Sequence, residues 1–314
     1  MIISKTPLRI SLVGGGTDVP AFYEKHPGAV VSFAINRYVY VAVNPKFDGR
    51  FRVSYSVTEN VDTVEDIRHD IVRNVLKNFK QERGLEIVSV ADIPGGGTGL
   101  GSSSAFTVGL VNALSWNGNY ISRGILAELS YKLEQECHPY IGKQDAYAST
   151  YGGMNYMQFK PNYATIEPME MNAETECWFL LLYTGVTRPS DELLSAQTKA
   201  FEADKIAIGR GMAALAEELH RQYQTGYVEF GILLHENWNL KTRLYGGVTN
   251  DKINFWYMQA RANGAIGGKV CGAGGGGFML FYAPPDAHAR IAKVTGLRRV
   301  EFRIEKEGSK VIYG

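Results

Sequence analysis

The sequence predicts an α+β protein of two domains. The chain has 314 residues, 45% of them hydrophobic, which is enough to bury two sizeable cores. Strand-like runs and amphipathic helical patterns are mixed along it without the regular strand–helix–strand rhythm of a parallel sheet. Residues 155–176 are polar and turn-rich. We therefore place the domain boundary in this stretch, with one domain over 1–168 and the other over 169–314.

The first half is predicted to contain several strands and one helix before its main glycine loop. Residues 8–13 are β-branched and apolar and stop at a glycine triplet, which indicates a strand that ends in a loop. Residues 28–43 resemble two successive strands, and 51–57 alternate apolar and polar residues as a half-buried strand does. A helix is expected near 65–81, where apolar residues share one face, and a further strand over 85–92.

A glycine loop at 95–101 is predicted to lead from this last strand into a helix. Ala105, Val108, Val111 and Leu114 follow the loop at helical spacing, and Thr98 and serines 102–104 add four hydroxyls beside it. Backbone N–H groups at a helix N-terminus bind phosphate, and glycine lets the backbone approach a ligand closely. A serine there can also bind the Mg²⁺ that bridges nucleotide phosphates. The loop therefore predicts a nucleotide phosphate site.

The rest of the chain predicts helices around one buried strand and a second glycine loop. Ser122 is expected to cap a helix that runs to about Cys137. Residues 177–183 are fully apolar, as in a buried strand, and helical patterns cover 191–223 and 227–241. Near the end, five glycines in KVCGAGGGGFMLFY lie between two short strand-like runs.

Composition and motif searches exclude several classes of function. The net charge of +1 gives no overall field for nucleic acid or an anionic membrane, and no apolar stretch reaches the roughly 20 residues of a membrane span. The three cysteines form no CxxC pair and no HExxH occurs, which argues against structural zinc. We expect a cytoplasmic protein with free thiols and with neither nucleic acid nor membrane as a partner.

The known nucleotide-binding motifs do not fit the glycine loops. No GxxxxGK[ST] Walker A sequence is present. A GxGxxG does occur at Gly272, Gly274 and Gly277, but it leads into a strand pattern, whereas a Rossmann loop opens a helix. This motif is the one feature that suggests a nicotinamide oxidoreductase, and the strand pattern that follows the motif argues against that class.

Three segments together resemble the motifs of a known family. PGGGTGLGSSSA, over 94–105, resembles the second motif of the GHMP kinases, the family of galactokinase, homoserine kinase and mevalonate kinase. KVCGAGGGGFML resembles their third motif, and PLRISLVGGGTD stands in the place of the first. The resemblance implies an N-terminal domain related to ribosomal protein S5 domain 2 and a ferredoxin-like C-terminal domain. It also implies an active site between them that uses ATP and Mg²⁺.

The form of the first motif points to one branch of this family. GGGTD replaces the Gly-Glu-His ending of galactokinase and mevalonate kinase, and with GKQDAYAS it resembles the branch containing D-glycero-D-manno-heptose 7-phosphate kinase and, more distantly, fucokinase. This implies a kinase that phosphorylates the anomeric hydroxyl of heptose 7-phosphate, with a homodimer as a possible assembly. A fucose- or galactose-type sugar 1-kinase is the alternative. A non-catalytic sugar sensor is another, although it would be expected to lack Asp145 or the serine loop.

The resemblance assigns roles to residues around the second motif. Asp145 matches the catalytic aspartate, although an aspartate there could also cap a helix, and Arg9 aligns with a basic residue near the reacting groups. Ser103 matches a Mg²⁺-binding serine, with the register open by one residue, and Glu134 a metal-binding glutamate, with Glu136 as its rival. Nucleotide contacts are expected at Pro94, Gly95, Gly96, Gly97, Thr98, Gly99, Leu100, Gly101, Ser102, Ser103 and Ser104.

The sugar is expected to lie between the first and third motifs. Asp18 could accept hydrogen bonds from two sugar hydroxyls, or serve as an ordinary turn residue. Arg188, in the loop after the strand at 177–183, could hold the 7-phosphate, with Lys143 as a rival and a solvated loop arginine as the simpler interpretation. The full set of expected sugar contacts is Gly15, Gly16, Thr17, Asp18, Gly152, Arg188, Gly274 and Gly275.

Overall fold

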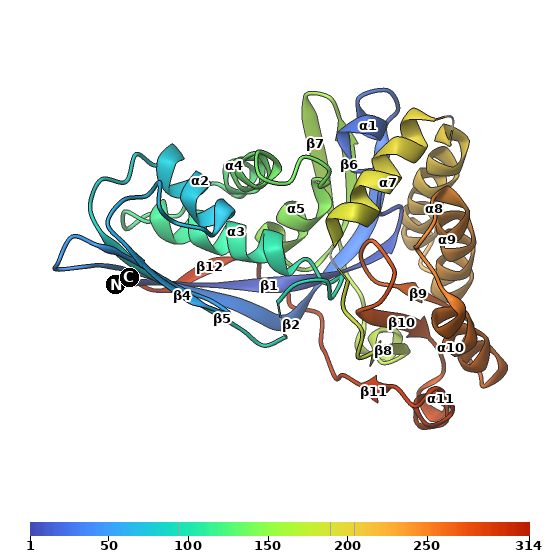
Figure 1. Ribbon diagram of the computed structural model, residues 1–314. Helices are drawn as coiled ribbons and strands as arrows, with labels where there is room; N and C mark the ends of the chain where they lie inside the picture. The colour runs from blue at the N-terminus through green and yellow to red at the C-terminus, as the bar shows by residue number, and fades with distance from the viewer. Residues whose placement is uncertain (94, 189, 204) are drawn as a thin grey trace.

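The computed structural model describes residues 1–93, 95–188, 190–203 and 205–314, and it has two β-sheets, each with packed helices (Figure 1). In the described part of the chain, the larger sheet has eight strands in the order β12-β1-β2-β5-β3-β4, and β6 and β7 extend from β2. These strands are β1 (Ile2–Val13), β2 (Gly28–Pro45), β3 (Phe51–Ser54), β4 (Thr58–Val61), β5 (Leu85–Ala91), β6 (Met154–Lys160), β7 (Tyr163–Met169) and β12 (Lys310–Tyr313).

The long strand β2 shows why one expectation was wrong. Residues 28–43 were expected to form two strands, but a single strand pairs with β1 along its length, with the register shifting after Pro7. Its first part also pairs with β6 through 28–33, and its second part with β5 through 39–45. The continuous β-branched and aromatic run therefore remains one strand while it changes its other neighbour.

Four helices cover one face of this sheet, α2 (Asp70–Asn78), α3 (Ser102–Leu114), α4 (Arg123–Gln135) and α5 (Gln144–Tyr151) (Figure 1). Helix α3 packs on β1 and β2 and between α4 and α5, so it is apolar on nearly all sides. The predicted cap of α4 is confirmed, since the Ser122 hydroxyl accepts the backbone N–H of Ile125 at 3.4 Å. Helix α2 begins later than expected because the Glu59 carboxylate binds the N–H groups of Arg68 and His69 and holds them outside the helix.

The smaller sheet is antiparallel with the order β11-β8-β10-β9. Its strands are β8 (Phe179–Tyr183), β9 (Gly267–Val270), β10 (Phe278–Tyr282) and β11 (Arg298–Arg299). The larger helices of this half are α7 (Ser190–Glu202), α8 (Ile206–Gln224), α9 (Phe230–Leu244), α10 (Asp251–Ala262) and α11 (His288–Thr295). The expected single helix over 191–223 is two helices, because α7 packs on the short α1 (Pro20–Tyr23), whereas α8 packs on β2 and α9.

The region between the halves also differs from expectation. Residues 155–176 hold most of β6, all of β7 and the short helix α6 (Ala173–Glu176), rather than a loop. The end of the chain then returns to the larger sheet, where β12 pairs with β1 and the two termini lie side by side (Figure 1). A short 3₁₀ turn, η1 (Pro285–Ala287), precedes α11. The predicted α+β class is confirmed, but the last residues of the 169–314 segment belong to the first sheet.

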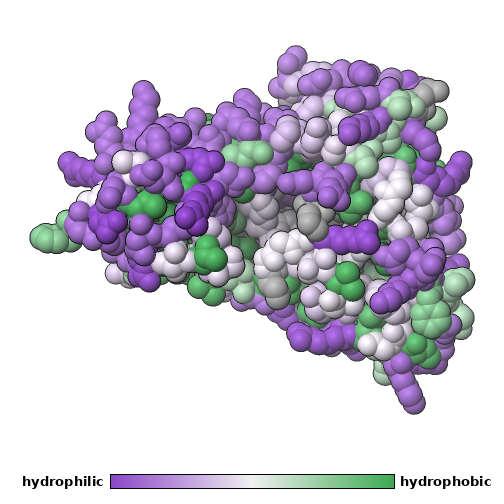
Figure 2. Space-filling model, viewed as in Figure 1, coloured by the Kyte–Doolittle hydropathy of each residue, from purple (hydrophilic) through white to green (hydrophobic). Residues whose placement is uncertain are grey.

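The surface is mostly hydrophilic, with a band of intermediate hydropathy where the two halves meet (Figure 2). None of the described helices combines the length and apolarity needed to cross a membrane.

Candidate active site

A cavity of about 780 Å³ lies between the two halves of the molecule. The segment 95–104 lines it from one side, and the end of β1 and the start of α5 form its floor. Residues of α7 and α9 and the beginning of the second glycine loop complete the wall. The volume falls in the range of known ligand pockets, and the elements that predicted nucleotide and sugar sites meet in it.

An arginine–aspartate pair lines this cavity. Arg9 is 4% exposed and donates to both oxygens of Asp145, from Nε at 2.6 Å and from Nη2 at 2.5 Å. Its remaining terminal nitrogen donates to the Gly99 carbonyl at 2.7 Å. Such a bidentate pair fixes the carboxylate in one orientation. Arg9 thereby connects β1, the first glycine loop and α5.

Asp145 does not cap a helix. It lies in the first turn of α5, whose N-cap residue is Lys143, and no side chain caps that terminus. Its side chain is 26% exposed, so one face of the carboxylate is open to the cavity. The Gln144 amide also donates to it at 3.1 Å. The geometry leaves Asp145 available to a ligand, as the catalytic assignment requires.

The loop 95–101 presents free backbone donors at the start of α3. Gly101, the N-cap residue, has φ of 75°, and no side chain caps this helix. A methyl group added at Gly95 or Gly96 would meet nothing within 4 Å, so this part of the loop borders open space. The hydroxyl of Thr98 is buried without a partner. An uncapped helix N-terminus beside open space is a suitable site for phosphate.

Glu134 lies beside the serines that follow this loop. It is 1% exposed, and burial raises its pKa to about 7, although the hydroxyls of Ser103 and Ser104 oppose that shift. Its Oε2 atom is buried and has no hydrogen-bond partner in the described structure. The rival Glu136 is exposed and accepts from Asn74 Nδ2 at 2.8 Å.

The residues present fit a magnesium ion that is shared with nucleotide phosphates. No group of three or more His, Cys, Asp or Glu suited to a metal occurs among the described residues. Mg²⁺ does not need one, because it is commonly held by one or two protein oxygens together with substrate phosphates and water. The orphaned carboxylate oxygen of Glu134 and the adjacent Ser103 hydroxyl supply such oxygens.

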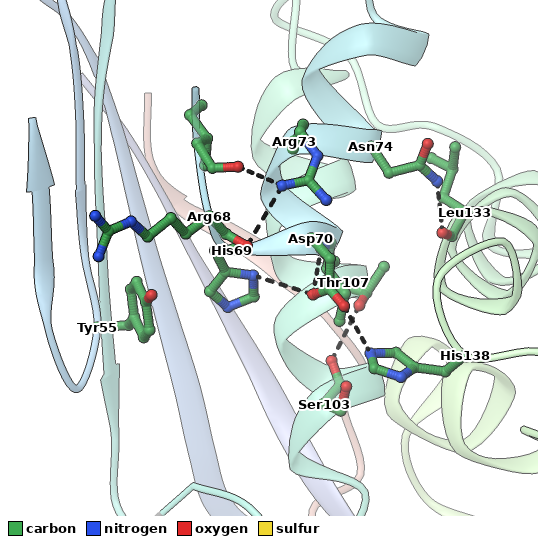
Figure 3. A network of polar contacts seen from close by, with 12 residues as sticks. Tyr55, Arg68, His69, Asp70, Arg73, Asn74, Ser103, Thr107, Leu133 and His138 are labelled. Atoms are coloured by element: carbon green, nitrogen blue, oxygen red, sulfur yellow. Dashed lines mark hydrogen bonds and ion pairs between the residues drawn. The ribbon is translucent and has the colours of Figure 1, made fainter. Parts of the chain in front are cut away.

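An aromatic and histidine cluster forms the cavity wall beyond the loop. The His69 ring faces Tyr55 (Figure 3), and the two ring centroids are 4.7 Å apart. It also packs on Phe106 at 5.1 Å, and burial lowers the pKa of His69. His138 lies 3.6 Å from Asp70 and 3.4 Å from Asp191, so it connects α2 with α7. The sequence analysis missed this cluster, because its members are far apart in the chain and match no motif.

The opposite end of the cavity is lined by small and polar residues. Asp18 is 5% exposed, and its oxygens accept the backbone N–H groups of Gly16 at 2.8 Å and Gln144 at 3.0 Å. Burial and the neighbouring Asp145 raise the pKa of Asp18. Asp18 thus holds the first-motif turn against α5 while it also lines the cavity. The polar lining residues that were not predicted include Ser11, Gln144, Gln197 and Lys241.

Several of the predicted site residues lie outside the cavity. Thr17 is fully buried and bonds to the Gly14 and Ala29 carbonyls, and Gly152 packs against the backbone at 307–308. Arg188 is exposed beside Gly97 and Gly275, and Lys143 is paired with Glu128 at 2.9 Å. Leu100 and Gly275 are buried, Gly274 is half-buried against Val248, and the third motif lines the cavity through Gly272 and Ala273. Pro94 lies outside the described residues.

Comparison with known proteins shows the family of this chain. The family model for the GHMP kinase N-terminal domain matches residues 69–153, and the model for the C-terminal domain matches 212–294. A D-glycero-alpha-D-manno-heptose 7-phosphate kinase of Campylobacter jejuni is 30% identical over 98% of both chains. The chain is a member of the GHMP kinase family. It is therefore a phosphotransferase with an alcohol acceptor, and the family uses ATP as the phosphate donor.

Other GHMP kinases place the chain in its family. An L-fucokinase/L-fucose-1-P guanylyltransferase of Bacteroides fragilis is 27% identical over 94% of this chain, which spans 36% of that protein. A crystal structure of a D-glycero-D-manno-heptose 1-phosphate kinase from Bacteroides thetaiotaomicron has a TM-score of 0.78 and 23% identity over the whole of both chains. The predicted two-domain GHMP fold is thereby confirmed. The GxGxxG segment lies between β9 and β10, which are antiparallel, so it is no Rossmann loop.

Proposed function

We propose that this kinase transfers the γ-phosphate of ATP to the anomeric hydroxyl of D-glycero-D-manno-heptose 7-phosphate, giving the 1,7-bisphosphate. The observation that carries the proposal is the position of Asp145. Arg9 holds its carboxylate at the junction between the uncapped start of α3 and the polar end of the cavity. The nucleotide phosphates and the sugar would meet at this junction.

The chemistry follows from that geometry. The anomeric oxygen forms a bond to the γ-phosphorus while the bond from that phosphorus to the bridging oxygen breaks, and ADP leaves with the electron pair. The hydroxyl proton passes to the Asp145 carboxylate, whose open face borders the cavity. Arg9 orients the carboxylate and adds positive charge beside the developing negative charge. Positioning and electrostatics supply most of the catalysis in phosphoryl transfer.

A magnesium ion would neutralise charge on the nucleotide phosphates. Ser103 and Glu134 are the residues that would hold it, because one offers a hydroxyl at the α3 start and the other a buried carboxylate without a partner. Burial favours the protonated form of Glu134, and therefore it raises the pKa of this carboxyl group. A bound cation would reverse that preference and keep the carboxylate ionised.

A phosphorylated heptose is the best-supported substrate. The Campylobacter jejuni relative named for this sugar matches almost the whole chain, and the GGGTD form of the first motif resembles the heptose kinase branch. The cavity volume of about 780 Å³ leaves room for a nucleotide and a seven-carbon sugar. The Bacteroides fragilis relative keeps a fucose-type sugar 1-kinase as the second candidate.

ADP release with a panel of acceptors tests the proposal. Heptose 7-phosphate should give the highest kcat/KM, above unphosphorylated heptose, fucose, galactose and mevalonate, and the product should carry phosphate at carbon 1. A charge-assisted contact to the substrate phosphate should favour heptose 7-phosphate over heptose by roughly tenfold. Equal use of both heptoses, or preference for fucose, would contradict the substrate assignment.

Asp145→Asn tests the catalytic assignment separately. The variant should fold and bind ATP but lose about 10²–10⁴ in kcat, because it removes a positioned proton acceptor. Asp62→Asn is the matched control, since Asp62 is exposed and does not line the cavity. An Asp145→Asn enzyme with near-wild-type kcat would exclude Asp145 from the reaction.

A further inference from the structure

Helix α9 carries a buried polar face that contacts the first motif at Gly14 and the third motif at Gly272. Asn237 is fully buried and its Oδ1 accepts the backbone N–H of Gly14 at 2.9 Å. One turn later, Lys241 is 4% exposed, lines the cavity, and donates from Nζ to the Gly272 carbonyl at 2.7 Å. The helix thus holds an ammonium group between the first and third motifs.

Lys241 and Arg9 are buried cations that line the cavity, and in the described part of the chain Lys241 has no carboxylate partner. Arg9 is paired with Asp145, and Lys143 with Glu128, each at ion-pair distance. Among the described residues, no carboxylate lies within that distance of Lys241 Nζ. An ammonium group has three N–H donors, and the Gly272 carbonyl uses one. A buried, unpaired cation is unfavourable unless a ligand supplies the counter-charge, so this group is arranged for an anion.

The groups around Lys241 place it beside the phosphoryl-transfer point. Gly272 is in contact with Gly99, whose carbonyl accepts from Arg9 Nη1. Arg9 and Lys241 therefore sit on the carbonyls of two touching glycines, one from each half of the molecule. Arg9, Lys241 and Asp145 all line the cavity, and Arg9 and Asp145 are close enough to Lys241 to influence its pKa.

Burial and the charged neighbours together set the pKa of Lys241. Burial is the main cause that lowers its pKa to about 8, Arg9 adds to this, and Asp18, Cys271 and Asp145 act in the opposite direction. Lys269, fully buried behind it on β9, donates to the Leu12 carbonyl at 3.2 Å and does not line the cavity. At neutral pH most Lys241 side chains are still protonated and can attract phosphoryl oxygens.

We propose that Lys241 binds the phosphoryl group in transit, donating hydrogen bonds to its oxygens as a second cation opposite Arg9. The inference rests on the proposed kinase reaction and adds no covalent step. The new bond still forms from the acceptor oxygen to the γ-phosphorus, the bond to ADP still breaks, and the proton still goes to Asp145. Lys241 keeps its protons throughout and lowers the energy of the negative charge that spreads over the transferred group.

Kinetics of Lys241→Met and Lys241→Arg test this role, with Lys269→Met as the matched buried control. Removing one preorganised donor to a transition-state oxygen costs about 10²–10³ in kcat, so Lys241→Met should fall in that range. Lys269→Met should keep near-wild-type kcat, and thermal unfolding should show all three variants folded.

The wild-type rate should fall as pH rises through about 8, because Lys241 loses its proton there. This alkaline limb should move upward in Lys241→Arg, which retains its charge.

Comparing two acceptors shows whether Lys241 binds the transferred phosphoryl group or the 7-phosphate of the sugar. If Lys241 holds the transferred group, Lys241→Met lowers kcat equally with heptose 7-phosphate and with unphosphorylated heptose. A loss confined to the phosphorylated acceptor and expressed in KM would overturn the proposal and assign Lys241 to the 7-phosphate. A kcat within about threefold of wild type on both acceptors would overturn it outright.

A binding experiment keeps this inference separate from the identity of the sugar. ADP with Mg²⁺ and fluoroaluminate mimics the phosphoryl group in transit, and calorimetry can measure its binding without an acceptor. Lys241→Met should weaken binding of this complex by at least about tenfold while leaving the Kd of ADP alone unchanged. Equal weakening of both ligands, or of neither, would overturn the inference even if the wild type proved active on another sugar.

Discussion

The two glycine loops are similar in sequence, but the structure gives them different tasks. In the first loop, 95–101, Gly95 and Gly96 border open space, and the loop ends at the uncapped start of α3. In the second, 272–277, an added methyl group would meet neighbouring backbone or side-chain atoms at every glycine, and the loop runs into a strand. Glycine is needed in the first loop for the approach of a ligand, and in the second for the approach of another chain segment.

The loops also hold one another in place. Gly272 lies against Gly99, and Gly277 against Thr98, so the second loop supports the first from behind. The groups beside the two loops also differ in whether they can bind a ligand. The first is followed by serines and the orphaned oxygen of Glu134, whereas the second exposes only Gly272 and Ala273 to the cavity. A high glycine count therefore locates an important loop but does not say what approaches it.

Gly99→Val should have the largest effect on the comparison, because Gly99 serves both purposes. Its φ is 78°, and an added Cβ would lie 2.3 Å from the Cys271 carbonyl oxygen, so the loop must move. Displaced backbone donors should weaken ATP binding by more than about 100-fold, as measured by calorimetry. Unchanged ATP affinity would mean that the first loop is a structural turn like the second.

The buried Glu134 beside the first loop and the exposed Glu136 should affect the pH dependence of stability differently when no divalent cation is added. Burial raises its pKa from 4.5 to about 7, so the unfolded chain releases this proton at lower pH than the folded protein does. The wild type should therefore lose stability as pH rises from about 4.5 to about 7, by up to about 3 kcal/mol relative to Glu134→Gln. Urea unfolding at pH 5 and pH 8 measures the difference, and the exposed Glu136→Gln is the control. Parallel behaviour of wild type and Glu134→Gln would contradict the burial of this carboxylate.

A matched pair of alanine substitutions separates ligand approach from chain approach. Gly96 and Gly277 have φ values of 80° and 79°, so alanine costs the same backbone strain at both positions. At Gly277 the new Cβ would also lie 2.2 Å from the Thr98 carbonyl, whereas at Gly96 it would meet nothing. Gly277→Ala should lower the free energy of unfolding by about 2–4 kcal/mol, against about 1 kcal/mol for Gly96→Ala. Equal losses would show that both loops are packed alike.

The smallest expected effect concerns the serine that follows the first loop. Ser103→Ala should raise the Mg²⁺ concentration for half-maximal activity by about tenfold, because one hard oxygen ligand is lost. Ser104, which is buried beside it, provides the register control. Should Ser104→Ala show the stronger magnesium dependence, the metal ligand lies one residue later than proposed.

The sequence predicted local structure well where one local signal dominates. The apolar spacing after Ser104 predicted α3, and the apolar run at 177–183 predicted β8. It failed where distant pairing decides the outcome, as for β6 and β7. Their polar residues suggested a loop, but β6 pairs with β2 and β7 pairs with β6, which makes both of them strands. β12 was also missed, since a short strand beside β1 cannot be recognised without its partner.

For the candidate site, the sequence by itself pointed to the glycine loop and the serines through their local chemistry, and to Arg9, Asp145 and Glu134 through the family resemblance. Only the tertiary structure decided which of them share a cavity. It brought Lys241 and His69 to that cavity and left Arg188 outside it. The physical reason is that burial and charge pairing depend on which segments pack together, and the ends of β1, α5 and α9 meet only when the two sheets are assembled.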